Sequence, residues 1–388
     1  MSSSRHLSLP SPHEEALTHS QLQIWIGQRL NPASPLYNMA FAFVLAGELC
    51  PERFQRAWQR VVDDNEALRT WVTEQDGAAV RRIRPEGCCP ATVLDLRSDP
   101  DPLGAFREWA RNRSAQPLPL DGELVESVLV QLGDQRTGWY LNQHHLISDA
   151  WSSVLLYRQV GAWYAALGGG AESPVELFPY YETAGRLQGR HRLVEGGAPD
   201  AATLAAATHW QSRLVPDGRT LPLYGRQPVP SGTASTRVTL TISRGRTDAL
   251  HELCLQNGFQ SLSRDLSRFA VFATLLLAWL SRISASPDLG FDAPVAGRPT
   301  PAARRSIGLF IEMFPFAVTG EAGDTFRTLG RRCLEEAATF LRHALPGTSA
   351  PSSGTASNVV LNFFPEPFGP FAGLPAPAAF NVMTRACG

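Results

Sequence analysis

The sequence predicts a mixed α/β protein, of the α+β kind, that is built as two lobes. Segments with apolar residues at helical spacing alternate with short segments rich in β-branched residues, in both halves of the chain. The chain has 388 residues, 44% of them hydrophobic, which is enough for two medium-sized cores. A run of glycines at 168–170 interrupts the pattern. We therefore expect a first lobe at 1–167, a connection at 168–232 and a second lobe at 233–388.

In the first lobe, helices and strands are predicted to alternate. The predicted helices are 17–30, 51–65 and 106–112, and the predicted strands are 37–45 and 68–72. Residues 125–132 alternate in polarity, and a turn at 133–138 followed by Trp139–Leu141 completes a hairpin. Ser148 or Asp149 is expected to cap the next helix, whose apolar residues recur at helical spacing up to Trp163.

The second lobe has the same mixed character. The predicted strands are 236–242, 289–295 and 358–364, and the predicted helices are 246–256, 269–283 and 325–343. A Pro-rich segment at 365–377 is expected to be a loop or an extended arm. The longest apolar run, Phe269–Leu280, has 12 residues, whereas a membrane span needs roughly 20. This run therefore predicts a buried helix rather than a membrane anchor.

Composition excludes several classes of function. The formal net charge is −1, which does not favour nucleic acid or an anionic membrane as a partner. All 35 basic residues are arginine, so a lysine Schiff base and a Walker-type lysine are excluded. The six cysteines form no C-x-x-C pair, which argues against zinc and a disulfide framework. Met1–Ser11 has no apolar core of a signal peptide, so a soluble, cytoplasmic protein is expected.

The most informative segment is 144–149 (HHLISD), which lies between the hairpin and the next helix. An imidazole accepts a proton readily near neutral pH, and His145 would lie at a strand end, facing a helix N-terminus. Backbone N–H groups at such a terminus can stabilise an oxyanion. The structural alternative is a pair of core histidines that His144 and His145 form beside a helix start. Asp149 is placed to fix the backbone through a buried ion pair.

Several further segments, together with 144–149, resemble the condensation domains of nonribosomal peptide synthetases, within the chloramphenicol-acetyltransferase-like acyltransferases. Residues 144–152 are similar to H-H-x-x-x-D-G-W-S. The other similar segments are 17–25 (opening Ser-x-x-Gln-x-x-x-Trp helix), 65–70 (R-H-E-x-L-R-T), 292–298 (G-T-P-V-A-G-R), 307–315 (I-G-x-F-V-N-T-L-P) and 358–363 (F-Q-V-x-F-N-Y). Several elements in the correct order over roughly 17–364 make the resemblance highly specific.

The resemblance implies two acetyltransferase-like lobes in a V with a central tunnel. Donor and acceptor carrier proteins would present substrates on their phosphopantetheine arms, and the protein itself would bind no cofactor and be monomeric. His145 corresponds to the histidine that positions or deprotonates the attacking amine, and His144 supports it. Asp149 would pair with Arg69 or Arg298. The residues expected to line the tunnel are Ala150, Trp151 and Ser152.

The chain also departs from the family pattern. Ala150 replaces the glycine that follows the aspartate. If this position needs a positive φ or a close approach of the substrate, the methyl group of alanine narrows the space, whereas in an ordinary first helical turn alanine is harmless. Glu312 stands where asparagine is usual, and 180–184 is a poor version of the Tyr-x-Asp-(Phe/Tyr)-Ala motif. The chain stops at Gly388, where the family normally continues.

Three functions are compatible with these features. The first is a condensation domain that forms an amide between carrier-bound substrates. The second is a related acyltransferase that uses a free amine or alcohol. The third is a catalytically silent docking module, which Ala150 and the short C-terminus favour and the intact His144, His145 and Asp149 oppose. Heterocyclisation is disfavoured because that subgroup carries aspartates in place of the histidine pair, and a metal role for the pair is disfavoured because no third ligand has suitable spacing.

Overall fold

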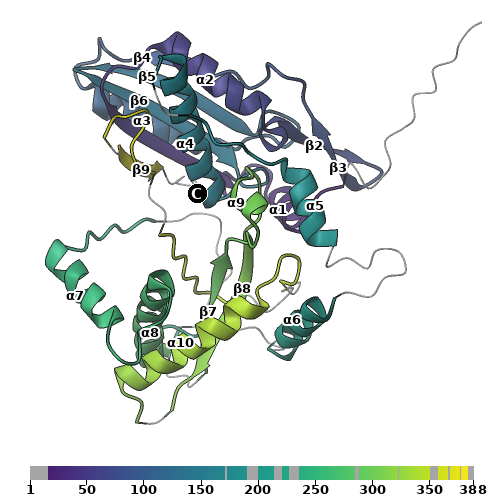
Figure 1. Cartoon of the computed structure of the whole chain (residues 1–388), viewed down its shortest axis with the longest axis vertical. Helices are drawn as coiled ribbons and strands as arrows, with labels where there is room; N and C mark the ends of the chain where they lie inside the picture. The colour runs from purple at the N-terminus through teal and green to yellow at the C-terminus, as the bar shows by residue number, and fades with distance from the viewer. Residues whose placement is uncertain are drawn as a thin grey trace, which may run out of the picture.

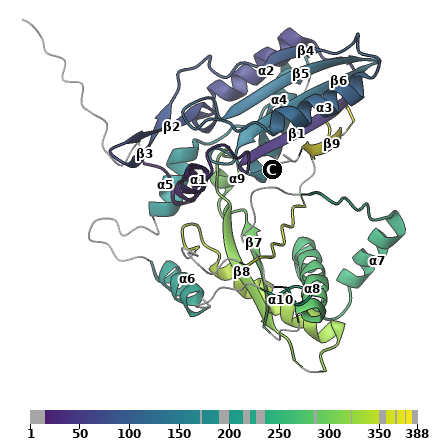
Figure 2. The same cartoon turned by 180° about the vertical axis from the view of Figure 1, so that it is seen from behind.

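The computed structural model describes residues 16–170, 173–189, 200–213, 221–226, 236–284, 288–321, 323–349, 357–365, 368–375 and 377–382. Two bodies are seen in Figures 1 and 2, each with its own sheet and helices. The first body holds the elements up to α4 together with β9, and the second holds α6, α7, α8, α10, β7 and β8. The mixed α/β fold predicted from the sequence is confirmed.

The first body is built on a sheet with the strand order β4-β5-β6-β1-β9. Its strands are β1 (Asn38–Ala46), β4 (Thr92–Asp95), β5 (Val125–Gly133), β6 (Arg136–His144) and β9 (Ala378–Val382). Neighbouring strands are antiparallel except β4 and β5, which are parallel. The hairpin predicted from the sequence is present as β5 and β6, and Asp134 and Gln135 form its turn with φ of 51° and 54°. This turn is tighter than the predicted one.

Helices cover both faces of this sheet. Helix α2 (Pro51–Asp63) packs on α4 (Ala150–Leu167), and α3 (Pro102–Ser114) contacts β1, β5 and β6. On the α2–α4 side, Phe43, Trp139 and Tyr157 are fully buried and their rings contact one another. The sheet is therefore buried on both faces, and the end of β6 is held on a rigid support.

A second group of elements lies beside this sheet. Helix α1 (His19–Leu30) begins at Thr18, whose side chain forms a capping box with Gln21. The 3-10 helix η1 (Glu66–Arg69) leads into the hairpin of β2 (Thr70–Gln75) and β3 (Ala78–Ile83). The strand predicted at 68–72 thus begins later than expected, because its first residues form the 3-10 turn. Helix α5 (Tyr180–Gly189), which was not predicted, follows.

The second body is organised around the antiparallel pair β7 (Asp288–Val295) and β8 (Glu312–Thr319). Helices α8 (Arg264–Ser284) and α10 (Phe326–His343) pack on each other and on these strands. Helix α6 (Ala201–Ser212) packs on α10, and α7 (Arg244–Cys254) packs on α8. Short helix α9 (Pro301–Arg304) follows β7 and lies next to α1 and α4 of the first body (Figures 1 and 2).

Helix α8 contains the apolar run that the sequence predicted as a buried helix. By length and composition it could cross a membrane, with a mean hydropathy of 1.5. In this structure Ala273, Leu277 and Leu280 are buried in the core of the second body, whereas Leu275 and Trp279 are nearly half exposed. The prediction holds for one face of the helix.

Two strands predicted for the second lobe are not formed. Residues 236–242 are irregular in this structure, and Val238 and Leu240 are 92% and 80% exposed. Their alternating pattern is that of a half-buried strand, but no described strand pairs with them. In 358–364, Val360 makes a single parallel bridge to Asp292 of β7. The described residues of 365–377 are irregular apart from a turn closed by a bridge between Phe371 and Leu374, as expected for a loop. Cys387 lies outside the described residues.

Candidate active site

The two histidines lie at the end of β6. His144 is the last residue of the strand and pairs with Asn38 of β1. The backbone N–H of His145 donates to the carbonyl of Tyr37 at 2.7 Å, so the first residue beyond the strand is still fixed to the neighbouring chain segment. Four residues later, Asp149 caps α4 by accepting from the backbone N–H of Ser152 at 2.8 Å. The predicted strand, tight loop and helix are therefore present in this order.

His144 is fully buried and held by two hydrogen bonds. Its Nδ1 accepts from the backbone N–H of Leu146 at 3.1 Å. Because Nδ1 is an acceptor, the proton of the neutral ring is on Nε2, which lies 3.2 Å from Oε1 of Gln28 and donates to it. Burial, with a smaller contribution from His145, lowers the pKa of His144 to about 3. His144 is thus a neutral side chain that shapes the turn.

His145 has a different environment. The residue is partly exposed, and its Nδ1 is a buried atom without a hydrogen-bond partner among the described residues. Burial lowers the pKa of His145 below its ordinary value, and the charge of Asp149 opposes this shift. The imidazole is therefore neutral near pH 7 and can accept a proton.

Asp149 is engaged by the second body. Its Oδ1 and Oδ2 accept from Nη2 of Arg298 at 2.9 and 3.1 Å, and Oδ2 also accepts from the backbone N–H of Phe310 at 3.0 Å. The side chains of Asp149 and Arg298 are each 2% exposed. Arg298 donates further to the carbonyls of Ala303, Ser306 and Gly308. The carboxylate is therefore saturated with donors, which suits a structural role.

Arg69 was the other predicted partner of Asp149, and this prediction is wrong. Nη1 of Arg69 donates to the carbonyl of Arg84 at 2.7 Å. Arg69 ends η1 and is thereby directed to the β2–β3 hairpin, whereas Arg298 lies in the loop between β7 and α9 that reaches α4. Spacing along the sequence does not distinguish these two arginines, because the choice depends on how the two bodies meet.

The three residues after Asp149 differ in their environments. Ala150 is the first residue of α4 in an ordinary helical turn, so its methyl group causes no backbone strain. Nε1 of Trp151 donates to the carbonyl of Arg304 at 3.0 Å. The hydroxyl of Ser152 is fully buried and donates to the carbonyl of Gly308 at 2.7 Å. Ser152 is therefore a connection between the bodies rather than a tunnel-lining residue, and lining by Ala150 and Trp151 stays a prediction.

The expected oxyanion donors at the start of α4 are partly occupied. The backbone N–H groups of Ser152 and Ser153 donate to the side chain and carbonyl of Asp149. These two groups are therefore not free to bind an oxyanion. The formation of the helix cap explains why these groups are occupied, because Asp149 accepts hydrogen bonds from the first backbone N–H groups of the helix.

Two glutamines of the site were missed from the sequence. Gln28 of α1 bonds to His144, and Gln143 of β6 accepts from Ser148 at 2.6 Å and donates to Ser153 at 3.0 Å. Gln28 and Gln143 are both buried. A polar amide at an apolar position of a helix or a central strand is a signal that could have identified both, because buried amides require partners.

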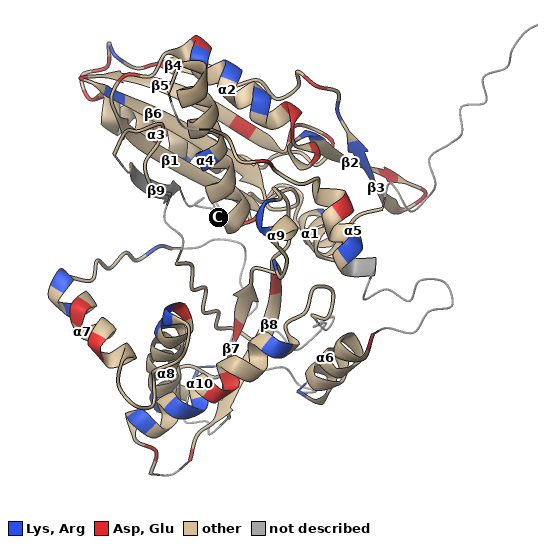
Figure 3. Cartoon of the chain, in the orientation of Figure 1, with Lys and Arg blue, Asp and Glu red and all other residues tan. Residues whose placement is uncertain are grey.

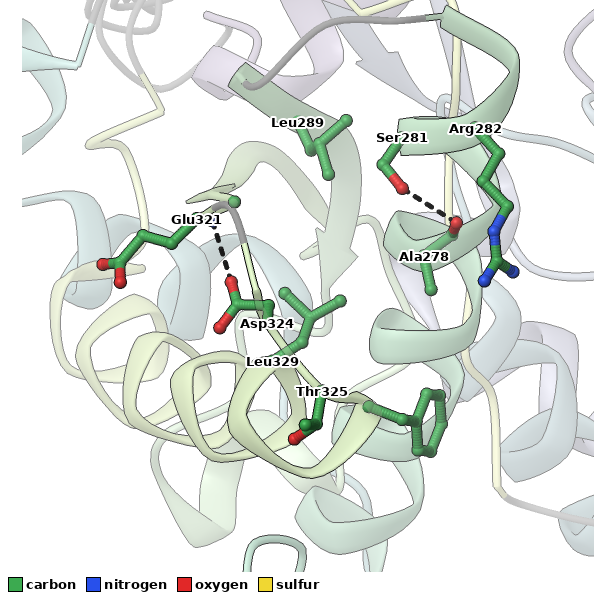
Figure 4. A pocket seen from close by; sticks show the side chains of 10 residues that line it. Ala278, Ser281, Arg282, Leu289, Glu321, Asp324, Thr325 and Leu329 are labelled. Atoms are coloured by element: carbon green, nitrogen blue, oxygen red, sulfur yellow. Dashed lines mark hydrogen bonds between the residues drawn. The ribbon is translucent and has the colours of Figure 1, made fainter.

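A cavity of about 390 Å³ in the second body lies away from these residues (Figure 4). Figure 4 shows Glu321 and Asp324 on one side and Ser281 and Arg282 on the other. The walls of the cavity come from the ends of α8 and β8 and the starts of β7 and α10. The end of β7 and the start of β8, which approach Asp149, lie at the opposite end of this strand pair. Among the described residues, no group of three or more His, Cys, Asp or Glu could hold a metal ion.

The comparisons with known proteins agree with this geometry. The profile of the condensation domain family matches residues 12–347. The chain is 27% identical over 340 residues to a linear gramicidin synthase of Brevibacillus parabrevis, covering 86% of this chain and 4% of that protein. It is 29% identical over 333 residues to a chondramide synthase of Chondromyces crocatus, covering 84% of this chain and 8% of that protein. The chain thus spans a small fraction of these relatives.

Solved structures show the same fold. The first condensation domain of the CDA synthetase superposes with a TM-score of 0.80 at 24% identity, covering 95% of this chain and 84% of that one. The starter condensation domain of rhizomide synthetase, in a complex with C8-CoA, gives a TM-score of 0.79 at 24% identity, covering 96% of this chain and 83% of that one. With the His144–His145 pair at the end of β6 and a family match over most of its length, the chain belongs to the condensation domain family, whose members form amide bonds in nonribosomal peptide synthesis.

Proposed function

We propose that this chain transfers an acyl or peptidyl group from a carrier-protein thioester to an acceptor amine held by a second carrier protein. Both substrates would be attached to the phosphopantetheine of their carriers. The observation that carries the proposal is the contrast between two neighbouring histidines. His144 uses both ring nitrogens in hydrogen bonds, whereas His145 is partly exposed and neutral.

The chemistry follows from a neutral imidazole at a fixed position. The amine nitrogen attacks the thioester carbonyl and forms a tetrahedral intermediate, and His145 accepts the proton that the nitrogen loses. The intermediate then collapses with cleavage of the carbon–sulfur bond, and the thiolate takes that proton from the imidazolium. The products are an amide and a free thiol. A positioned base contributes about 10²–10⁴-fold, and holding two tethered substrates in line supplies much of the rest.

Asp149 has a positioning role in this proposal. Its carboxylate is saturated by Arg298, Ser152 and Phe310, so it does not compete for the proton. By capping α4 and pairing with the second body, it fixes the loop that carries His145. Ala150 lies in an ordinary helical turn, which weakens one of the features that favoured a silent docking module.

The experiment compares wild type with His145→Ala, using carrier-bound acyl donors and a panel of carrier-bound amines, free amines and alcohols. His251→Ala is the matched control, because His251 lies exposed on α7. We expect amide on the acceptor carrier, read by intact-carrier mass spectrometry, at least 10²-fold less with His145→Ala and unchanged with His251→Ala. Equal background turnover by all three folded proteins would contradict catalysis. Transfer to free acceptors alone would indicate the related acyltransferase.

We also propose that the protein acts in the cytoplasm as a monomer. In its proposed division into lobes at 1–167 and 233–388 joined by 168–232, two elements lie with the other part, since α6 of the connection packs in the second body and β9 pairs with β1 of the first. The mixed distribution of charge supports a protein without a nucleic-acid or membrane partner, since basic and acidic residues are interspersed over both bodies (Figure 3). Light scattering of the purified protein tests the oligomeric state, and cell fractionation tests the location.

A further inference from the structure

Cys88 and Cys89 form a thiol pair in the first body, outside the residues that carry the proposed reaction. Their Sγ atoms lie 3.6 Å apart. Neighbouring side chains on an extended backbone point to opposite sides, but Cys89 has a φ of 53°, in the left-handed region. This conformation brings the two sulfurs together.

The turn that carries the two thiols is fixed from several sides. Nε1 of Trp58 donates to the carbonyl of Cys89 at 2.8 Å, and Nε2 of Gln59 donates to the carbonyl of Cys88 at 3.2 Å. The backbone N–H of Cys89 donates to Glu123 at 3.3 Å. Two consecutive residues of α2 thus hold the two consecutive carbonyls, so the backbone that carries both thiols is fixed.

Both thiols are free in this structure, and their sulfurs are at a non-bonded contact distance, well beyond the roughly 2.05 Å of a disulfide. This separation suits a bridge through a third atom. Two sulfurs bound at about 2.3 Å to one soft centre, with an angle of about 90–110° between the bonds, lie roughly 3.3–3.8 Å apart, a range that includes the observed 3.6 Å. Among the described residues, no third His, Cys, Asp or Glu joins the two cysteines in a metal-binding group, so the bound centre must be one that two protein sulfurs can hold.

We propose that Cys88 and Cys89 are a binding site for a soft, thiophilic centre that bonds to two cysteine sulfurs, of which a trivalent arsenical is the representative. Cys88 is partly exposed and offers the entry, whereas Cys89 is 3% exposed and lies behind it. With an arsenic(III) oxide of the type R–As=O, two S–H bonds break and two As–S bonds form. The oxygen leaves as water with both thiol protons, and arsenic stays trivalent, so no oxidant is needed.

The pair should bind more tightly than either thiol alone. Once the first sulfur is bonded, the second is within the same turn, and such an effective concentration gives about 10²–10⁴-fold in affinity. Bridging would also tie the turn more firmly to α2.

The test titrates the folded full chain with phenylarsine oxide and reads the adduct by intact-protein mass spectrometry. We expect one equivalent on wild type, released by a small dithiol but not by a monothiol. Cys88→Ser should lower the affinity at least 10²-fold. Cys50→Ser is the control, because Cys50 is a partly exposed single thiol at the start of α2, and it should behave as wild type.

Cys88→Ser is the decisive variant because it alters a partly exposed side chain. Cys89→Ser alters a core residue and can disturb folding. Circular dichroism of each variant shows that the comparison is between folded proteins. Absence of the adduct on wild type, or an undiminished affinity of Cys88→Ser, would overturn the proposal.

Discussion

Arg298 and Asp149, which are 149 residues apart in the sequence, form a buried ion pair that joins the two bodies. The guanidinium is directed to Asp149 by a loop of the second body, and the carboxylate begins α4 of the first. One interaction therefore fixes both the start of the helix and the junction between the bodies.

Replacing Arg298 by methionine should strongly destabilise the protein. It leaves the carboxylate of Asp149 buried without its cation, and breaking a buried pair in this way costs about 3–5 kcal/mol. Urea unfolding measures the change. Asp149→Asn combined with Arg298→Met should lose less than the sum of the two single variants, because the second change removes a group that was already unpaired. Additive losses below about 1 kcal/mol each would contradict a structural ion pair.

Gly297 precedes this arginine and should not tolerate a side chain. Its φ is +63°, and an added Cβ would lie 2.1 Å from the carbonyl oxygen of Phe310. Gly297→Ala should therefore displace Arg298 as well as strain the backbone. Gly77→Ala is the matched control, because Gly77 has a φ of +77° with nothing within 4 Å. We expect the control to lose about 1 kcal/mol in the free energy of unfolding and Gly297→Ala to lose several-fold more. Equal losses would show that the close approach has no effect.

Gln28→Leu tests the tautomer of His144. The substitution leaves the Nε2–H of a buried ring without an acceptor, which costs about 1–3 kcal/mol. Nitrogen NMR of the labelled imidazole should show the proton on Nε2 in wild type and a changed Nε2 signal in Gln28→Leu. The control is Gln23→Leu on the same helix, where Gln23 contacts His19 at an exposed position. An unchanged His144 signal in Gln28→Leu would argue against this hydrogen bond.

The pH dependence of condensation should report the state of His145. Burial lowers its pKa, so the ring is neutral at pH 7 and activity is lost only as the pH falls through that lowered pKa. We expect kcat/KM to rise with pH to a midpoint below the ordinary value of about 6.5 and then to level off. If deprotonation of the acceptor amine causes a second rise in kcat/KM at higher pH, a less basic amine should lower the midpoint of that second rise. The first midpoint, which belongs to His145, should not change. A first midpoint at or above about 6.5 would contradict a desolvated base.

Much of the fold followed from local patterns. The hairpin of β5 and β6, the cap of α4 and the helices α2 and α10 have strong periodicity, and their existence was predicted within a few residues. Thr236–Ile242 shows the limit of this reasoning. Alternating polarity indicates a strand, but a strand forms only where another chain segment offers hydrogen bonds, and local sequence does not contain that information.

The site was predicted unevenly for the same reason. His144, His145 and Asp149 are contiguous with a strand end and a helix start, so their placement could be predicted. The choice between Arg69 and Arg298, the contact of Gln28 with His144, and the burial of Ser152 under Gly308 depend on elements more than a hundred residues apart. These contacts are set when the bodies dock.

Strand β9 forms the edge of the first body's sheet next to β1, although it is the last of the described elements along the chain. During synthesis on a ribosome, the edge of β1 that pairs with β9 therefore stays unpaired until residues 378–382 emerge, after the whole second body. Exposed edges of this kind are templates for pairing with other chains. Nascent chains released before residue 378 should consequently aggregate or recruit chaperones more than chains that include β9, even though they contain every residue of the proposed catalytic machinery.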